Sequence, residues 1–155
     1  MKKLFNLTYR SANRDDLDWL YETEKACFNP CDAFSRKMIY QLLQNKNKTI
    51  IFDIIQTDQQ SIGYAIYLTR RNSSKIRLYS LCILPKYSGQ GFAKQYLTKR
   101  LGNLPNLYKE MVLEVRVSNK KALQLYFYLG FMIETTLPYY YEDGEDGYKM
   151  YKIIF

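Results

Sequence analysis

Small residues recur at every second position of one short segment, from Gly89 through Gly91 to Ala93. The segment follows an apolar run and precedes a run with helical spacing, so its backbone N–H groups would lie uncovered at a helix N-terminus. Such N–H groups and the helix dipole bind phosphate, and Lys86 and Lys94 would add positive charge. A tight strand-to-helix turn that binds no ligand would have the same pattern. The segment is not a P-loop, because no Gly-Lys-Ser/Thr follows, and it lacks the βαβ setting of a dinucleotide fingerprint.

The composition excludes several kinds of chemistry. The 155 residues include no histidine, which removes a histidine base, Ser-His and Cys-His pairs and the usual zinc sites, and no metal is expected. Cys27, Cys31 and Cys82 form no Cys-x-x-Cys pair, so a reducing, cytoplasmic location is expected. No apolar run approaches the roughly 20 residues of a membrane helix, and the N-terminus lacks the apolar core of a signal peptide.

The charge is strongly positive. Lys and Arg number 23 against 15 Asp and Glu, a formal net charge of +8. Such a surface attracts nucleic acid, an acidic protein or a phosphorylated cofactor, although a solvated basic surface is an equally good explanation. Sixteen tyrosines among the basic residues could also stack on bases, which keeps an RNA-binding module among the alternatives.

Strand-like and helix-like runs alternate along the chain without a repeat or a linker, which predicts one domain over residues 1–155. Alternating or continuous apolar residues predict strands at 5–10, 49–56, 61–69, 75–84, 109–117, 131–137 and 148–154. Helical spacing and capping residues predict helices at 17–28, 35–43, 93–104 and 122–129. The order β-α-α-β-β-β-α-β-α-β-β predicts a mixed, mostly antiparallel sheet flanked by helices, an α+β fold of the three-layer α/β type.

Two motifs in this order resemble those of a known family. The glycine turn is similar to the acetyl-CoA pyrophosphate loop of the GNAT superfamily of N-acetyltransferases, whose pattern is Gln/Arg-x-x-Gly-x-Gly/Ala. The chain has Ser88-x-x-Gly91-x-Ala93, so a serine stands where a long polar side chain is usual. Downstream, Leu-Glu-Val-Arg-Val-Ser-Asn at 113–119 and Leu-Tyr-x-x-x-Gly-Phe at 125–131 resemble the ribosomal-protein alanine N-acetyltransferase (RimI-like) branch.

The resemblance implies acetyl-CoA as the cofactor. The residues that it assigns to the cofactor are Leu81, Cys82, Ile83, Gly89, Gln90, Gly91, Phe92, Ala93, Lys94 and Asn119. Asn119 is equally well placed to cap a helix, and both roles can hold together. Cys82 has no apparent base beside it, so direct transfer in a ternary complex is favoured over an acyl-enzyme.

Glu114 and Tyr126 are the candidate catalytic residues. Strand alternation places Glu114 opposite Leu113 and Val115, where it could equally be a salt-bridged surface residue. The resemblance implies that Glu114 is the base for the acceptor amine, with Glu24 as a second choice. Tyr126 lies on the apolar stripe of its helix and could simply be a core residue; the resemblance implies that it protonates the departing thiolate.

The acceptor is expected between two loops that flank it in the related branch. One loop contains Phe28 and Phe34, and the other contains Tyr139 and Tyr140. These aromatic side chains could clamp a peptide or pack on one another. Acidic residues at 142–146 could attract a cationic amine or form a solvated turn.

The sequence thus predicts an acetyl-CoA-dependent N-acetyltransferase that acts on the α-amine of a peptide or protein N-terminus, such as that of a ribosomal protein. A small-molecule amine or a lysine side chain is the alternative acceptor. A non-catalytic RNA- or ribosome-binding module is the rival from another class. Under the enzyme interpretation neither a nucleic acid nor a membrane is expected as a partner, and the oligomeric state is left open.

Overall fold

The computed structural model describes residues 6–154. Within them, seven strands form one sheet in the order β1-β2-β3-β4-β5-β7-β6. The strands are β1 (Leu7–Ser11), β2 (Ile50–Thr57), β3 (Gln60–Thr69), β4 (Lys75–Ile83), β5 (Glu110–Arg116), β6 (Met132–Leu137) and β7 (Gly147–Ile153). Among the described strands, β4 and β5 are the only neighbours that pair in parallel. The predicted mixed, mostly antiparallel sheet of an α+β fold is confirmed; the predicted start of the first strand, Phe5, lies outside the described residues.

Four α-helices and two short 3₁₀ turns connect the strands of the described chain. They are the turn Arg14–Asp16, α1 (Leu17–Cys27), α2 (Arg36–Gln44), the turn Pro85–Tyr87, α3 (Phe92–Leu101) and α4 (Lys120–Tyr128). Ser35 caps α2 by accepting a hydrogen bond from the Met38 N–H at 3.1 Å, as the sequence predicts. None of the helices in residues 6–154 is long and apolar enough to cross a membrane.

Helix α3 ends one turn earlier than the apolar spacing predicts. Its last residue is Leu101, and Gly102 follows as the C-cap. The side-chain amide of Asn103 donates to the Lys99 carbonyl at 2.9 Å, which satisfies one of the last free carbonyls of the helix. Leu104 still packs against the core, so its apolar character reflects burial rather than helix.

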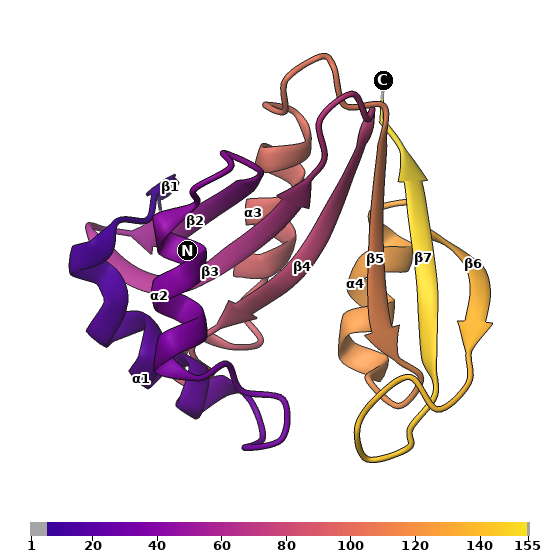
Figure 1. The fold of residues 1–155 in the computed structure, drawn as a ribbon, viewed down its shortest axis with the longest axis horizontal. Coiled ribbons are helices and arrows are strands. Elements are labelled where there is room, and N and C mark those ends of the chain that lie inside the picture. Colours follow the sequence, from indigo (N-terminus) through magenta and orange to yellow (C-terminus); the bar gives the residue numbers. More distant parts are fainter. Residues whose placement is uncertain (1–5, 155) are drawn as a thin grey trace, which may run out of the picture.

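The helices cover the two faces of the sheet and make three layers (Figure 1). On one face, α1 and α2 bury Leu20 and Ile39 against Ile54 and Ile66 of the sheet. On the other face, α3 and α4 pack against a second and larger core, which includes Phe92, Tyr96, Leu97, Tyr126, Tyr67, Leu113 and Met150. Burial of apolar surface on both faces fixes the sheet between the helices.

The parallel strands β4 and β5 pair over only part of their length. Lys75–Leu78 pairs with Glu110–Leu113, and beyond these residues the two strands diverge (Figure 1). A register shift in the β3–β4 pairing makes Tyr79 an extra residue, because Ile66 pairs with Ser80 and Tyr67 with Leu78. The sheet therefore opens at the ends of β4 and β5, where the two strands face the N-termini of α3 and α4.

Candidate active site

The glycine turn between β4 and α3 is open toward solvent. Gly89 and Gly91 have φ angles of 77° and 82°, in the left-handed region that favours glycine. A Cβ at either position would meet no atom within 4 Å, so the backbone there is unobstructed. Gly91 is the N-cap of α3 and makes no side-chain capping hydrogen bond, so the positive end of the helix dipole lies at this open turn, where it favours an anion.

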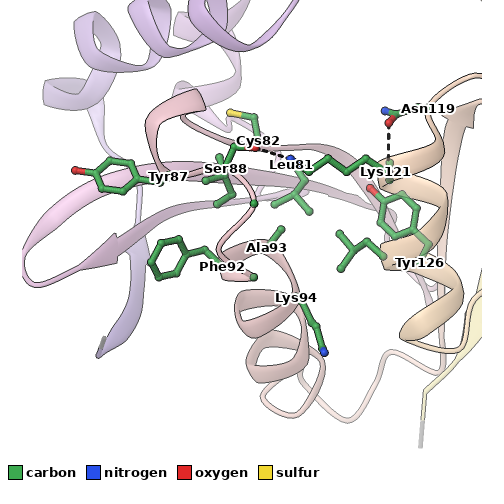
Figure 2. A pocket seen from close by; sticks show the side chains of 15 residues that line it. Leu81, Cys82, Tyr87, Ser88, Phe92, Ala93, Lys94, Asn119, Lys121 and Tyr126 are labelled. Carbon is green, nitrogen blue, oxygen red and sulfur yellow. Dashed lines mark hydrogen bonds between the residues drawn. The ribbon is translucent and has the colours of Figure 1, made fainter. Parts of the chain in front are cut away.

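A cavity of about 300 Å³, here called the cofactor cavity, leads from this turn between β4 and α4 (Figure 2). Every residue that the sequence assigns to the cofactor lines it except Gln90. The side chain of Gln90 is exposed and donates to the Lys86 carbonyl at 3.5 Å. Asn119 caps α4 by accepting from the Ala122 N–H at 3.2 Å and also lines the cavity.

Lys121 is the residue at this turn that sequence reasoning missed. It lies in the first turn of α4, lines the cofactor cavity, and its ammonium donates a hydrogen bond to the Ser88 hydroxyl. The ammonium of Lys94 instead lies 3.6 Å from the centre of the Tyr128 ring. Lys121 therefore brings positive charge to the position where Ser88 replaces the usual long side chain. No local pattern could predict this contact, because the two residues are 33 positions apart.

A second cavity, of about 320 Å³, lies on the α1–α2 side of the same opening. The residues that line it are Glu24, Phe28, Asp32, Phe34, Leu78, Tyr79, Ser80, Leu81, Glu114, Val115, Arg116, Asn119, Ala122, Tyr126 and Tyr141. Four of these also line the cofactor cavity, namely Leu81, Asn119, Ala122 and Tyr126. The two cavities therefore meet beside Tyr126.

Tyr126 is 9% exposed and packs edge-on against Phe131, with 5.6 Å between the ring centres. Burial raises the pKa of its hydroxyl to about 12, and the nearby Tyr141 adds to this effect. The hydroxyl is therefore a neutral hydrogen-bond donor at physiological pH. It belongs to the packed core and to both cavities at once.

The two candidate bases stand in different surroundings. Glu114 forms an ion pair with Arg77, with 2.9 Å between its Oε2 and the guanidinium Nε. Glu24 is only 2% exposed, yet it lines the second cavity, and it makes no ion pair within residues 6–154. Burial raises the pKa of Glu24 to about 7, although its Oε1 accepts a hydrogen bond from the Phe34 N–H at 2.9 Å.

Arg116 joins the two loops that border the second cavity. Its guanidinium pairs with Asp32 of the α1–α2 loop at 2.8 Å. It also pairs with Asp143 at 2.8 Å and Glu145 at 2.9 Å, both in the β6–β7 loop, and lies 4.1 Å from the centre of the Tyr141 ring. These contacts are called the Arg116 clasp below. Two of the acids expected to attract an amine or face solvent are thus held in ion pairs.

The aromatic residues predicted for the acceptor are only partly brought together. Phe28 and Phe34 line the second cavity, and Phe34 stacks on Tyr79 with 5.5 Å between ring centres. Tyr139 is 82% exposed, and Tyr140 accepts a hydrogen bond from Arg77 at 3.3 Å; neither lines the cavity. Tyr141 lines it instead. From the sequence, the position of Tyr139, Tyr140 and Tyr141 in the loop before the last strand did not show which of them faces the second cavity.

Sequence comparison assigns the chain to a family. The model of the Acetyltransferase (GNAT) family matches residues 14–131, so the chain belongs to this family and is an N-acetyltransferase. The resemblance drawn from the glycine turn and the downstream stretches at 113–119 and 125–131 is confirmed. The family uses acetyl-CoA as its acetyl donor.

Individual relatives agree with this assignment. The chain is 28% identical over 158 residues to the N-alpha-acetyltransferase of Saccharolobus solfataricus, with 94% of this chain and 92% of the relative covered. Its fold is similar to that of the ribosomal-protein-S18-alanine N-acetyltransferase from Escherichia coli, with a TM-score of 0.81, 24% identity, and 96% and 94% of the two chains covered. It is also similar in fold to the spermidine N-acetyltransferase from Vibrio cholerae in complex with CoA and spermine, with a TM-score of 0.81, 22% identity, and 96% and 95% covered.

Proposed function

We propose that this enzyme transfers an acetyl group from acetyl-CoA to the α-amine of a protein N-terminus, directly and in a ternary complex. The observation that carries the proposal is the position of Tyr126, where the cofactor cavity and the second cavity meet. A donor held in one cavity and an amine held in the other would approach each other beside its hydroxyl. Holding both reactants in the reactive geometry removes much of the entropic cost of bringing them together, which accounts for a large part of the rate enhancement of such a transfer.

The cofactor cavity suits coenzyme A. The unobstructed backbone at Gly89 and Gly91, the N-terminus of α3 and the ammonium of Lys121 suit a pyrophosphate. The apolar side chains of Leu81 and Leu125 suit the pantetheine arm. When bound, acetyl-CoA would supply a thioester as the activated acetyl group. In this arrangement Gln90 contributes its backbone rather than its side chain, which turns away.

Tyr126 acts as the acid in the proposed reaction. Its buried hydroxyl remains protonated at neutral pH, so it can donate a hydrogen bond to the departing sulfur and then its proton. After the transfer the phenolate takes up a proton from water before the next turnover, and the raised pKa of the hydroxyl favours this protonated form.

Glu24 is the better matched of the two candidate bases. A base works best when its pKa is close to the working pH, and an N-terminal α-amine has a pKa of about 8. Burial brings the pKa of Glu24 to about 7, whereas Glu114 is engaged by Arg77. We therefore assign removal of the amine proton to Glu24. Glu114 instead supplies a negative charge that attracts the cationic amine. The sequence analysis favoured Glu114 as the base and Glu24 as the second choice, so the two roles are exchanged.

The second cavity supports a peptide as the acceptor. Phe28, Phe34 and Tyr141 can contact a peptide backbone around the amine, while Tyr139 and Tyr140 lie farther out, where they could contact later residues of the acceptor. The relative from Saccharolobus solfataricus is named an N-alpha-acetyltransferase, which also supports an N-terminal amine over a small amine or a lysine. Membership of an acetyltransferase family argues against a non-catalytic RNA-binding module.

An acetylation screen tests the proposal. The acceptors are peptides with free N-termini, including those of ribosomal proteins, the same peptides with blocked N-termini and one internal lysine, and spermidine; released CoA is measured. Only the first group should be acetylated efficiently. The Tyr126→Phe variant should bind acetyl-CoA like the parent and lose about 100-fold in kcat. Preferred acetylation of blocked lysine peptides or of spermidine would contradict the proposal.

A further inference from the structure

A groove of about 480 Å³ lies on the open part of the sheet and is lined mainly by cationic and uncharged side chains. Four cationic side chains line it, Arg70, Lys75, Arg77 and Lys149, against one acidic side chain, Glu114. It is called the basic groove below. The site described above uses only Arg77 and Glu114 of these residues.

The fold explains why this face is open and charged. Ile76 and Leu78 of β4 belong to the core beneath α3 and α4, so Lys75 and Arg77 between and beside them face the opposite side of the sheet. Lys149 lies between two residues of the same core and also faces that side. Helices α1 and α2 cover only the β1–β3 part of this face, and no helix of the described chain, residues 6–154, lies over β5 and β7 there (Figure 1).

The positive charge of the basic groove is only partly neutralised. Three of its four cations have an acidic partner: Lys75 lies 3.6 Å from Glu110, Arg77 lies 2.9 Å from Glu114, and Lys149 lies 3.2 Å from Glu134. Arg70 is exposed and forms no ion pair within residues 6–154. A neighbouring hollow shares Arg70 and adds the cations of Lys48 and Arg71. The surface therefore has cationic groups available for an anionic partner.

The basic groove is continuous with the second cavity. Glu114 lines both, and Arg77, its partner at 2.9 Å, has its guanidinium 5.2 Å from the centre of the Tyr79 ring, which lines the second cavity. Along β4, Leu81 at the junction of the cavities is four residues from Arg77 and six from Lys75. At about 3.3 Å per residue these separations are about 13 and 20 Å. An extended peptide has the same rise per residue, so a chain with its amine near Leu81 would reach Arg77 and Lys75 after about four and six residues.

We propose that the basic groove binds acidic side chains of the acceptor polypeptide, at about the fourth to seventh residue after the reactive amine. This inference rests on the proposed function, since it requires a peptide with its N-terminus beside Tyr126. No aromatic side chain among residues 6–154 lines the groove, which gives no stacking platform for single-stranded RNA in this part of the chain. The enzyme therefore selects among N-termini by charge downstream of the reactive residue.

Three peptides test this inference. They share the first three residues and differ only at positions four to seven, which are all Glu, all Gln or all Lys; released CoA gives kcat and KM. We expect KM for the Glu peptide to be about 3- to 30-fold lower than for the Gln peptide, and highest for the Lys peptide, with kcat within about twofold. Raising the salt concentration should narrow the differences.

Matched variants separate the groove from general charge. Arg70→Gln with Lys75→Gln should remove most of the difference between the Glu and Gln peptides. Arg14→Gln with Lys37→Gln removes two exposed cations that line neither the basic groove nor the second cavity; it changes the net charge equally and should preserve this difference. Equal KM values for the three peptides, or a preference that survives in the groove variant, would overturn the inference.

Two further outcomes have distinct meanings. If none of the three peptides is acetylated, the proposed function fails, and the inference fails with it. If the peptides are acetylated equally while an oligouridylate of about 20 nucleotides binds the parent and not the groove variant, the groove is a nucleic-acid surface, and the peptide inference alone is wrong.

Discussion

At the level of single residues, burial determines how Glu24 responds to pH. Its pKa rises on folding from an ordinary value of 4.5 to about 7, because the carboxyl is desolvated. A carboxyl with a raised pKa contributes its full stability below the unfolded pKa and loses it as the pH rises through the folded pKa. The folded protein therefore loses stability between about pH 4.5 and pH 7, where the unfolded carboxyl ionises more readily.

The Glu24→Gln variant should separate this effect from packing. The amide oxygen can still accept the hydrogen bond of the Phe34 N–H, but the ionisation is lost. We expect it to be more stable than the parent by about 1–3 kcal/mol near pH 8, with no gain near pH 4, in urea unfolding at the two pH values. If Glu24 is the base, kcat of the parent should rise with pH around pH 7, as the Glu24 carboxyl ionises. In Glu24→Gln this rise of kcat should disappear.

Glu114→Gln is the control for the role of Glu24 as the base. Glu114→Gln should lower kcat, but kcat should still rise with pH around pH 7, because Glu24 still ionises there. If instead Glu114→Gln abolishes that rise and Glu24→Gln leaves it in place, Glu114 is the base.

Lys121 carries a second prediction at this scale. Because its ammonium reaches Ser88 at the mouth of the cofactor cavity, Lys121→Gln should raise KM for acetyl-CoA by about 10-fold and leave kcat nearly unchanged. The neighbouring Lys120 does not line the cavity, so Lys120→Gln should change KM less than twofold. Equal effects of the two substitutions would indicate general attraction of an anion rather than a specific contact.

At the level of elements, the Arg116 clasp holds the α1–α2 loop to the β6–β7 loop. Arg116→Gln would leave Asp32, Asp143 and Glu145 without their common partner and let the loops separate. KM for a peptide acceptor should rise about 5- to 30-fold, while KM for acetyl-CoA stays within about twofold, because Arg116 does not line the cofactor cavity.

Arg10→Gln is the matched control for the clasp. Arg10 also makes a bidentate ion pair, with Asp16 at 2.7 and 2.9 Å, but it lines neither the cofactor cavity nor the second cavity. Its loss should leave both KM values unchanged. A parallel rise in the two KM values of Arg116→Gln would point to general loosening of the fold instead.

Sequence periodicity predicted the helices and strands well, but it predicted the contacts between distant elements poorly. The strand order along the chain, the cap at Ser35 and the position of Tyr126 on an apolar stripe depend on neighbours within about four residues. The divergence of β4 from β5 depends on pairing between distant strands, as does the partnership of Glu114 with Arg77. For the same reason the sequence could not rank Glu24 above Glu114, nor select Tyr141 from three adjacent tyrosines. Burial and long-range ion pairs decide these points.

At the scale of the whole molecule, a buried polar network ties α3 to the sheet. Asp53 of β2 is 2% exposed and accepts a hydrogen bond from the Tyr96 hydroxyl at 2.5 Å, which in turn lies 2.9 Å from the hydroxyl of Tyr67. Arg100 pairs with Asp53 at 3.0 Å and lies 4.8 Å from the centre of the Tyr9 ring. The network thus joins β1, β2, β3 and α3 beneath the half of the sheet that carries α1 and α2 on its other face.

Removal of Arg100 should therefore destabilise the whole domain. Desolvation raises the pKa of Asp53, and Arg100 is the cation that opposes this effect. Without it, Asp53 must either remain a buried unpaired carboxylate or take up a proton. Arg100→Met fills the space with an apolar chain and should lower the free energy of unfolding by about 3–5 kcal/mol near pH 7, measured by urea unfolding.

The exposed pair of Arg36 and Asp18 provides the comparison. Arg36→Met removes the same type of cation from a solvated ion pair and should cost less than about 1 kcal/mol. The deficit of Arg100→Met should also shrink as the pH falls toward 4, because protonation of Asp53 removes the unpaired charge. A pH-independent deficit would mean that Arg100 stabilises the domain through packing on Tyr9 rather than through its charge.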